Sequence, residues 1–398
     1  MNMKKTLLIL CAFLALTASS CDKQNTASQE QEAAKGEYVL SFTSDTLRYL
    51  GVGESLSFEV KVAAAPSEDK TIGLYVPANT SEYCRAYNYK YAAVAQPLAK
   101  SMYTLGTAEL KAGQTEVVLK LDIDQSAVHA EVSEKPFLIP LSVQSTDGTM
   151  KSHDTRYVLV PSYSVSEEGK TRVHTAGASS FLEISYPYSG NTKALIFCPG
   201  GGYSSLGTKD VETWEGQGIT MALLNYTLPI NELIGRHDLV IQDAGDAVDI
   251  MRANASRWGG YSQVGTVGRS AGGHLAGLTA NLFKDKVDYQ ILLYPVISMD
   301  IARSHEGSVL HFLGYNRSQA DVDAYSLEKI VTADTPRAFV AYSYDDAVVP
   351  QKYNGPVYVK ALQAAGVEVH DDPHDTGGHT TVNWSNFPSD MHAWLKTF

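Results

Sequence analysis

The chain has 398 residues, of which 44 % are hydrophobic, and this is enough material for two domains with sizeable apolar cores. Its formal net charge is −12, and because no basic clusters offset that charge, we exclude nucleic acid and anionic lipid surfaces as expected partners. Four cysteines do not make a disulfide framework in a chain of this length. We expect Cys84 and Cys198 to be two buried thiols rather than a disulfide.

The N-terminal segment predicts an exported lipoprotein. A basic start precedes the apolar run Leu7–Leu16, which is far shorter than the ~20 residues that a membrane span requires. The run ends in Ala18-Ser19-Ser20-Cys21, which resembles a relaxed lipobox. We therefore predict a signal peptide at residues 1–20, a lipid on Cys21 that anchors the chain to a periplasmic or cell-surface membrane, and a flexible polar tether at residues 21–37. The alternative is a simple secretory signal with an incidental cysteine.

Residues 38–165 show short stretches in which apolar and polar residues alternate. Ser55–Val62 and Glu116–Ile123 are examples, and proline, glycine and Asp/Asn turns separate such stretches. The pattern predicts an all-β, immunoglobulin-like sandwich domain. The segment also resembles the N-terminal sandwich domain of lipoproteins in bacterial glycan-utilisation systems, with Tyr103–Leu105 and Leu110–Gly113 as the best local match.

Four tyrosines of this domain, Tyr83, Tyr87, Tyr89 and Tyr91, cluster around an expected loop. Aromatic faces suit stacking on sugar rings, but tyrosine is also a good strand residue that packs well. We therefore favour structural support over glycan binding as the role of the domain.

After a polar linker at residues 166–178, strands alternate with helices. This order implies a mostly parallel sheet that helices cover on both faces, in a domain of residues 179–398. The expected helices include Leu239–Arg257 and Phe387–Leu395. The expected strands are Phe181–Tyr186, Ala194–Cys198, Thr220–Tyr226, Val264–Gly268, Gln290–Tyr294, Ala338–Tyr342 and Val367–His370.

The motif Gly268-Arg269-Ser270-Ala271-Gly272 stands between one of these strands and a helix. In a G-x-S-x-G pattern the small residues permit a sharp turn, so that the serine hydroxyl stands at its tip. The following helix N-terminus directs free N–H groups toward the reacting oxygen. By itself the motif is weak evidence for a nucleophile, since a glycine-rich turn with a surface serine can have the same sequence. In this setting it predicts a nucleophile at Ser270.

A second glycine-rich loop, Cys198-Pro199-Gly200-Gly201-Gly202-Tyr203, comes directly after the expected strand that begins at Ala194. Consecutive glycines adopt backbone angles that other residues resist, and they expose N–H groups. Beside a nucleophile such groups can hold a developing oxyanion. We prefer this interpretation to that of a plain flexible loop.

Partners for the serine follow in the order that α/β-hydrolases use. The strand that ends at Tyr342 leads into a stretch with two carboxylates, Asp345 and Asp346, and His379 comes later on a glycine-containing loop. In this arrangement Ser270 is the nucleophile, His379 is the general base and then acid, and the aspartate orients the imidazole.

Several stretches together are similar to the compact bacterial α/β-hydrolases that include acetylxylan esterases and related carbohydrate esterases. The resemblance runs from about residue 180 to residue 398. It is carried by 198–203, 225–229, 268–276, 293–298, 305–308, 345–350 and 377–379.

The resemblance implies an α/β-hydrolase fold without a cofactor. Its D-x-x-V pattern points to Asp345 as the triad acid, with Asp346 in reserve. It carries oxyanion donors over to Gly201, Gly202, Tyr203 and Ala271. The chain departs from the pattern at Cys198-Pro199, Tyr342-Ser343 and Thr380-Thr381, and these changes leave the triad intact but could reshape the pocket.

Two further residues in the matching stretches, Tyr226 and His305, are candidates for the substrate pocket, although a structural role for His305 is an equal alternative. The spacing of His370, His374 and His379 matches no metal motif, and we expect no metal.

The chain between Ser270 and Asp345 leaves no room for a large lid, and an open, short acyl pocket suits acetyl groups on a polar glycan. We therefore predict a serine carboxylesterase that deacetylates plant-type polysaccharide or oligosaccharide through an acyl-enzyme. A feruloyl or other short-acyl esterase is the alternative, and an oligopeptidase-like hydrolase or a non-catalytic glycan-binding lipoprotein is less favoured. The oligomeric state stays open.

Overall fold

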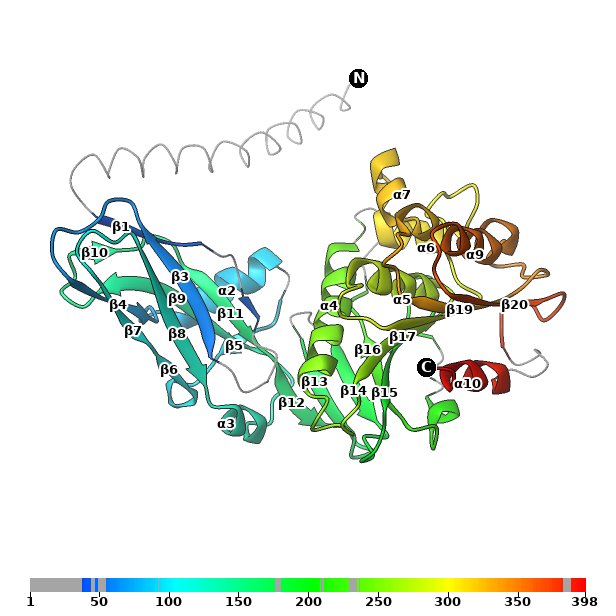
Figure 1. Ribbon diagram of the computed structural model, residues 1–398, viewed down its shortest axis with the longest axis horizontal. Helices are drawn as coiled ribbons and strands as arrows, with labels where there is room; N and C mark the ends of the chain where they lie inside the picture. The colour runs from blue at the N-terminus through cyan, green and yellow to red at the C-terminus, as the bar shows by residue number, and fades with distance from the viewer. Residues whose placement is uncertain are drawn as a thin grey trace, which may run out of the picture.

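The structure of the protein, a computed structural model, describes residues 38–43, 47–48, 55–91, 93–175, 180–207, 209, 211–228, 235, 237–381 and 388–398. The predicted signal peptide, Cys21 and the tether lie outside the described residues. Figure 1 shows two lobes side by side, an all-β lobe from the N-terminal part and an α/β lobe from the C-terminal part. The predicted combination of an all-β region and an α/β domain is therefore confirmed.

Alternating burial explains the strands of the N-terminal domain. In β3 (Leu56–Val62) and β8 (Glu116–Ile123) alternate side chains are buried, and the strands pair antiparallel with Phe58 opposite Leu119. The strands follow the order β2-β11-β9-β10-β1-β3-β8-β6, and β4 joins β7 and β9. The other elements are β1 (Tyr38–Phe42), β2 (Leu47–Arg48), β4 (Lys70–Tyr75), β5 (Gln96–Pro97), η1 (Lys100–Met102), β6 (Tyr103–Leu105), β7 (Thr107–Leu110), α3 (Gln125–Ala130), β9 (Phe137–Ser145), β10 (Met150–Lys151) and β11 (Arg156–Val160).

The tyrosine cluster lies on a helix, α2 (Thr80–Tyr91), so the expectation of a loop is wrong. Cys84, Tyr87 and Tyr91 are spaced so that they share one helical face. Tyr87 is buried and packs on the rings of Tyr91 and Tyr157, with centroids 4.7 and 5.1 Å away. Tyr89 points away and is 94 % exposed. Both Cys84 and the distant Cys198 are free and buried, as predicted.

The structure corrects the boundary between the domains. The strand β12 (Ser162–Val165) was assigned to the sandwich and residues 166–178 to a linker, yet β12 pairs with β13 (Thr171–His174), and β13 pairs with the next strand of the α/β sheet. The sheet of the C-terminal domain therefore begins at Ser162. The polar composition of this segment concealed the pairing, because Ser162, Ser164 and Ser166 are buried although serine is typical of loops.

The two domains meet at Tyr163 of β12. Its carbonyl accepts a hydrogen bond from the backbone N–H of Ser133, and its ring lies beneath the Arg257 guanidinium, 5.5 Å from the ring centroid. Arg257 also contacts the imidazole of His129 in α3, with Nη1 2.8 Å from Nδ1. A strand that belongs to one sheet is thus held by residues of the other domain.

The C-terminal sheet follows the order β12-β13-β14-β16-β15-β17-β18-β19-β20 within the described residues. Neighbours pair in parallel from β16 through β15 to β20, while β14 pairs antiparallel with β16. The strands are β14 (Phe181–Ser185), β15 (Lys193–Cys198), β16 (Ile219–Asn225), β17 (Gln263–Arg269), β18 (Tyr289–Leu293), β19 (Arg337–Ser343) and β20 (Val369–His374). Each expected strand is found, although β20 starts two residues late and continues to His374.

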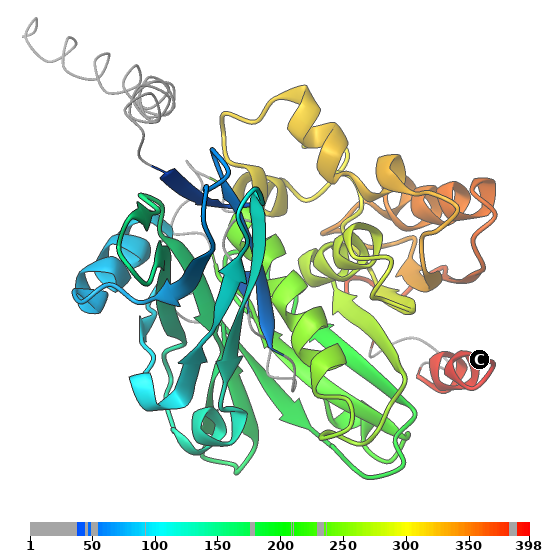
Figure 2. The ribbon, with the colours of Figure 1, turned by 60° about the vertical axis from the view of Figure 1, so that its left-hand side comes forward.

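Helices cover both faces of this sheet, because successive side chains of a strand point to opposite faces. Ile196 of β15 belongs to the core beneath α4 and α5, whereas Phe197 belongs to the core beneath α10. Figure 1 and Figure 2 show α10 on the opposite side of the sheet from α5 and α9. The helices are η2 (Glu212–Trp214), α4 (His237–Ala253), α5 (Ala271–Leu282), α6 (Glu306–Leu313), α7 (Gln319–Tyr325), α8 (Leu327–Ile330), η3 (Gln351–Tyr353), α9 (Gly355–Ala364) and α10 (Ser389–Leu395).

In the part of the chain that the structure describes, no helix is both long enough and apolar enough to cross a bilayer. Parallel strands bring their carboxyl ends to one edge of the sheet. The ends of β15, β17 and β19 meet at this edge, and the candidate site residues follow directly after them.

Candidate active site

Ser270 stands at the turn between β17 and α5, with φ 54° and ψ −122°. Residues other than glycine seldom adopt a positive φ, and such strain is typical of functional positions. Flanking glycines permit the turn: a Cβ on Gly268 would lie 2.0 Å from the carbonyl oxygen of Gly272, and one on Gly272 would lie 2.1 Å from that of Cys198. The two glycines therefore let the turn, the helix and the loop after β15 come into contact, as the G-x-S-x-G pattern predicts.

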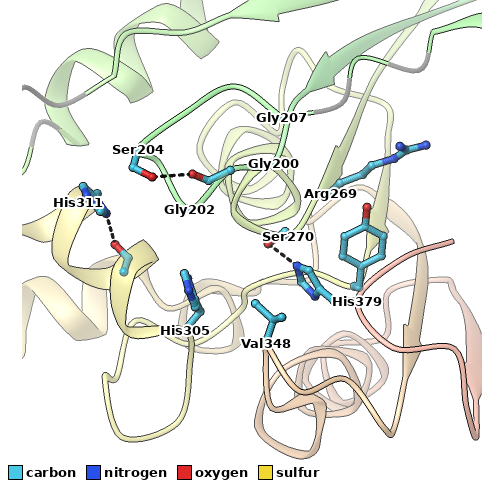
Figure 3. A pocket seen from close by; sticks show the side chains of 13 residues that line it. Gly200, Gly202, Ser204, Gly207, Arg269, Ser270, His305, His311, Val348 and His379 are labelled. Carbon is cyan, nitrogen blue, oxygen red and sulfur yellow. Dashed lines mark hydrogen bonds between the residues drawn. The ribbon is translucent and has the colours of Figure 1, made fainter.

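His379 connects Ser270 to a carboxylate. Its Nε2 lies 2.8 Å from Oγ of Ser270, and its Nδ1 lies 2.7 Å from Oδ2 of Asp346 (Figure 3 shows the contact between Ser270 and His379). An ionised carboxylate only accepts hydrogen bonds, so Nδ1 carries the proton and Nε2 accepts from the serine hydroxyl. The imidazole is therefore set to remove the proton of Ser270.

The carboxylate that contacts His379 is Asp346, so the prediction of Asp345 is wrong. Beyond the end of β19 the chain turns, and the backbone N–H of Asp346 donates to the carbonyl oxygen of Ser343. The two neighbouring aspartates consequently point in different directions. Oδ1 and Oδ2 of Asp345 accept hydrogen bonds from the backbone N–H groups of Gly378 and Gly377, at 2.7 and 3.2 Å.

The carboxylate of Asp346 is held ionised by its surroundings. Its side chain is fully buried, and burial by itself would raise its pKa, but hydrogen bonds from His379 and from the backbone N–H of Val349 and Val348 outweigh burial and hold the pKa below its usual value. A group that stays charged can stabilise the imidazolium that forms when His379 takes a proton.

The loop after β15 supplies backbone N–H groups beside the serine. Gly201 and Gly202 have positive φ, at 126° and 63°, and both line the cavity that contains Ser270. A Cβ on Gly201 would lie 2.2 Å from the carbonyl oxygen of Ser205, so this tight turn requires glycine. Ala271 is the first residue of α5, where an N–H group has no intrahelical acceptor. The structure therefore places Gly201, Gly202 and Ala271 beside Ser270, where the sequence predicts oxyanion donors.

Tyr203 and Tyr226 lie beneath this loop and not in the cavity. The hydroxyl of Tyr203 contacts Nδ1 of buried His274 at 2.7 Å, so only its backbone could face a substrate. The hydroxyl of Tyr226 donates to the carbonyl oxygen of Pro199 at 2.7 Å, and the side chain is 1 % exposed. The prediction that Tyr226 lines the substrate pocket is therefore wrong, because its side chain is buried and its hydroxyl binds the backbone of the glycine-rich loop.

A cavity of about 380 Å³ opens at Ser270. His305, the other pocket candidate, lies in its lining and caps the N-terminus of α6. Tyr294 packs against the imidazole of His379, with ring centroids 4.6 Å apart. The lining consists of Gly200, Gly201, Gly202, Ser204, Gly207, Arg269, Ser270, Tyr294, His305, Gly307, His311, Val348 and His379.

Several lining residues were not proposed as site residues from the sequence, and Arg269, Val348 and His311 are examples. Arg269 and Val348 lie inside motifs that the sequence analysis identified, so their positions in those motifs could have indicated that they lie near the site. His311 stands one helical turn after Gly307, and its Nδ1 contacts the carbonyl oxygen of that residue at 2.6 Å. Nothing in its sequence setting distinguishes His311 from a histidine on a solvated helix face.

The chain has the α/β-hydrolase fold, and its hydrogen-bonded serine, histidine and carboxylate have the arrangement that serine hydrolases use. Among the described residues, no group of three or more histidine, cysteine or acidic side chains is placed to hold a metal ion.

Comparison with known proteins agrees with this class. Residues 236–383 match the family described as alpha/beta hydrolase fold, and the C-terminal part of the chain carries this fold. Residues 27–150 match a family described as an N-terminal domain.

The chain is 32 % identical over 228 residues to an acetylxylan esterase of Xylanibacter ruminicola, covering 53 % of this chain and 47 % of the relative. It is 30 % identical over 187 residues to endo-1,4-beta-xylanase B of Butyrivibrio fibrisolvens, covering 42 % of this chain and 29 % of the relative. The chain thus spans less than half the length of either curated relative.

A solved structure with a similar fold is the acetyl ester-xyloside bifunctional hydrolase of Caldicellulosiruptor lactoaceticus. It is 26 % identical, with a TM-score of 0.49, and the match covers 55 % of this chain and 87 % of that one.

Proposed function

We propose that this protein is a serine carboxylesterase that removes acetyl groups from plant-type polysaccharide or oligosaccharide. The observation that carries the proposal is the set of hydrogen bonds that joins Ser270 through His379 to Asp346, at a cavity that Gly201 and Gly202 also line. The likeness to a relative named as an acetylxylan esterase supports the choice of substrate class.

The reaction follows from the placement of these groups. As Oγ of Ser270 attacks the acetyl carbonyl carbon, Nε2 of His379 accepts its proton, and the carbonyl oxygen becomes an oxyanion. We assign the stabilisation of that oxyanion to the backbone amides of Gly201, Gly202, Tyr203 and Ala271. The C–O bond to the sugar then breaks, and the proton on His379 passes to the leaving alcohol, which leaves an acetylated Ser270.

Water completes the cycle by the same steps. His379 accepts a proton from water, the resulting hydroxide equivalent attacks the acyl carbon, and the bond to Oγ breaks as the proton returns to Ser270. Acetate is released, and the enzyme regains its starting state. Asp346 stays ionised throughout and stabilises the imidazolium at both stages.

The lining of the cavity supports a short acyl group. Most of the lining residues are glycines or have polar side chains, and the larger apolar side chains are those of Tyr294 and the half-exposed Val348. A long acyl chain gains affinity from extended apolar cover, which these described residues do not supply. An acetyl group on a polar sugar needs no such cover.

The test compares the wild type with Ser270→Ala for acetate release from acetylated xylan and acetylated pectin. We expect release by the wild type alone, and the ratio between the polymers identifies the preferred glycan. A matched control, Ser204→Ala, changes another serine of the cavity wall and is expected to keep the nucleophile. If neither polymer nor p-nitrophenyl acetate is hydrolysed, the proposal of an esterase is wrong.

We also propose that the protein is an exported lipoprotein held on a periplasmic or cell-surface membrane through Cys21. The support is the sequence pattern of residues 1–21. Metabolic labelling with a radioactive fatty acid tests this: label should enter the wild type and be lost in Cys21→Ala. Equal labelling of both proteins, or of neither, contradicts the anchor.

A further inference from the structure

His305 occupies the cavity wall across from the nucleophile. It immediately precedes α6, is half-buried, and lines the same cavity as Ser270 and His379. Figure 3 shows its side chain rising from the loop before α6 toward Gly202 of the oxyanion loop. Neither the proton transfer nor the oxyanion site described above uses this imidazole.

Two glycines leave room for the imidazole ring. A Cβ on Gly202 would lie 3.3 Å from Cε1 of His305, and a Cβ on Gly307 would lie 3.0 Å from the same atom. Real Cβ contacts are seldom so close, so a larger residue at either position would displace the ring. The ring is therefore held between the oxyanion loop and the first turn of α6, in a defined position relative to the reacting ester.

The hydrogen bonds of the ring decide which nitrogen carries the proton. The backbone N–H of Ser308 donates to Nδ1 at 3.2 Å, and the hydroxyl of Ser308 lies 2.9 Å from the same nitrogen. A nitrogen that accepts from a backbone N–H cannot itself be protonated, so the neutral ring has its proton on Nε2. Burial is the largest effect on His305 and lowers its pKa, which favours the neutral ring.

The Nε2–H group is a donor without a protein acceptor among the described residues. Substrate binding is more favourable when the substrate brings an acceptor to a half-buried donor beside the reaction site. Binding is less favourable when the substrate leaves that donor without a hydrogen bond. A sugar offers hydroxyl and ring oxygens next to the acetylated position. An aryl ester such as p-nitrophenyl acetate has none there.

We infer that His305 is a specificity-determining residue whose Nε2–H donates a hydrogen bond to a saccharide oxygen next to the scissile ester. This inference rests on the proposed deacetylation of a glycan. It assigns recognition of the sugar to the α6 side of the cavity, while the backbone amides of the oxyanion loop bind the acyl oxygen. The substrate class that benefits is an ester whose alcohol part carries neighbouring oxygen acceptors.

His305→Asn separates recognition from structure. Asparagine is a favoured N-cap whose side-chain oxygen accepts from a backbone N–H, so this variant keeps the cap on α6 while it removes the donor at Nε2. The readout is the ratio of kcat/KM for an acetylated xylo-oligosaccharide to kcat/KM for p-nitrophenyl acetate. We expect this ratio to fall about tenfold, as for the loss of one hydrogen bond to substrate.

Two companion variants make the comparison specific. His305→Gln places an amide N–H group near the position of Nε2 and should recover part of the lost ratio. Glu306→Gln changes the exposed neighbour at the start of α6 and should keep the wild-type ratio. A tenfold effect in Glu306→Gln as well would assign the result to the helix end and overturn the inference about the imidazole.

A second measurement does not depend on turnover. In ¹⁵N-labelled Ser270→Ala protein, the histidine nitrogen shifts report the tautomer directly, and we expect His305 to have a protonated Nε2 and an unprotonated Nδ1. A proton on Nδ1 overturns the inference. This measurement does not need the His305→Asn variant, so it tests the inference even if that variant fails to fold.

The outcomes separate the inference from the proposed function. If the wild type deacetylates the oligosaccharide but His305→Asn keeps its ratio, the inference is wrong and the function stands. If His305→Asn loses both activities equally, His305 acts on the shared machinery and not on the sugar. If the wild type hydrolyses p-nitrophenyl acetate but no acetylated saccharide, the proposed substrate is wrong and the inference is wrong with it.

Discussion

Asp345 and Asp346 are neighbours in the chain, and both hold His379 in place by different means. Asp346 accepts a hydrogen bond from Nδ1 of the imidazole at 2.7 Å. Asp345 accepts from the backbone N–H groups of Gly377 and Gly378, the two residues directly before His379. One carboxylate thus orients the ring, and the other fixes the loop that carries it.

This division predicts different losses for two similar substitutions. Asp346→Asn would remove the charge that stabilises the imidazolium and permit the wrong tautomer, so we expect kcat to fall by about 10³- to 10⁴-fold. Asp345→Asn keeps one acceptor oxygen for the loop, and we expect a loss of about tenfold or less. Hydrolysis of p-nitrophenyl acetate at about pH 7 measures both.

The assignment of the triad acid depends on the order of these two effects. Circular dichroism should show that both variants keep the native fold, so that the loss of kcat reflects the site. A larger loss in Asp345→Asn than in Asp346→Asn would contradict the assignment.

The lowered pKa of Asp346 predicts a dependence of stability on pH. Its folded-state pKa lies below the usual value of 3.8, so the ionised form stabilises the folded state above that pH, and this contribution disappears as the pH falls through the folded-state pKa. The free energy of unfolding of the wild type should therefore fall more steeply in acid than that of Asp346→Asn. Urea denaturation of both proteins between about pH 6 and pH 3 measures the difference. Parallel curves would show that Asp346 has no lowered pKa.

The contact between α5 and the oxyanion loop requires glycine at position 272. In Gly272→Ala the new Cβ would lie 2.1 Å from the carbonyl oxygen of Cys198 and 2.4 Å from that of Pro199. Both are backbone atoms, so the nucleophile turn and the loop must separate, and we expect a loss of about 2 kcal/mol or more in stability. Because the amides then leave the oxyanion position, kcat/KM should fall by about 10²-fold.

Gly277→Ala on the same helix is the matched control. Its Cβ would lie 2.5 Å from Cδ1 of Leu327, which is the end of a side chain and not a backbone atom. We expect a change within about 1 kcal/mol, since alanine favours a helix interior. Thermal unfolding and turnover of p-nitrophenyl acetate measure both variants, and similar effects at the two positions would argue against a special contact at Gly272.

The helix α2 predicts a contrast between two tyrosines of the N-terminal domain. Tyr87 is 4 % exposed and Tyr89 is 94 % exposed. Tyr87→Ala should lower the free energy of unfolding by about 3 kcal/mol, because it leaves a cavity against Tyr91 and Tyr157. Tyr89→Ala should change it by less than about 0.5 kcal/mol. Urea denaturation measures both variants.

If the N-terminal domain gives structural support only, a polysaccharide pull-down with xylan should retain the wild type and Tyr89→Ala equally well. Lost retention in Tyr89→Ala would favour glycan binding instead.

The elements that the sequence predicted well have strong local signals. The strands of the parallel sheet are apolar runs that are buried on both faces, and the turn at Ser270 has a glycine pattern that few other structures require. The strands at the domain boundary were missed because the hairpin of β12 and β13 has the polar composition of a linker. The helix α2 was missed because its tyrosines have the composition of a strand or loop.

By itself the sequence determined the α/β sheet, the nucleophile turn, and the pairing of Ser270 with His379, since each depends on residues that are local in the chain or ordered along it. Only the tertiary structure decided between Asp345 and Asp346, because neighbouring side chains at a turn point in different directions. The sequence motif does not indicate which of the two carboxylates contacts the imidazole. In the same way the tertiary structure removed Tyr226 from the cavity and placed His305 there. Whether a side chain faces a cavity depends on how distant strands and helices pack, and that packing is set by the whole fold.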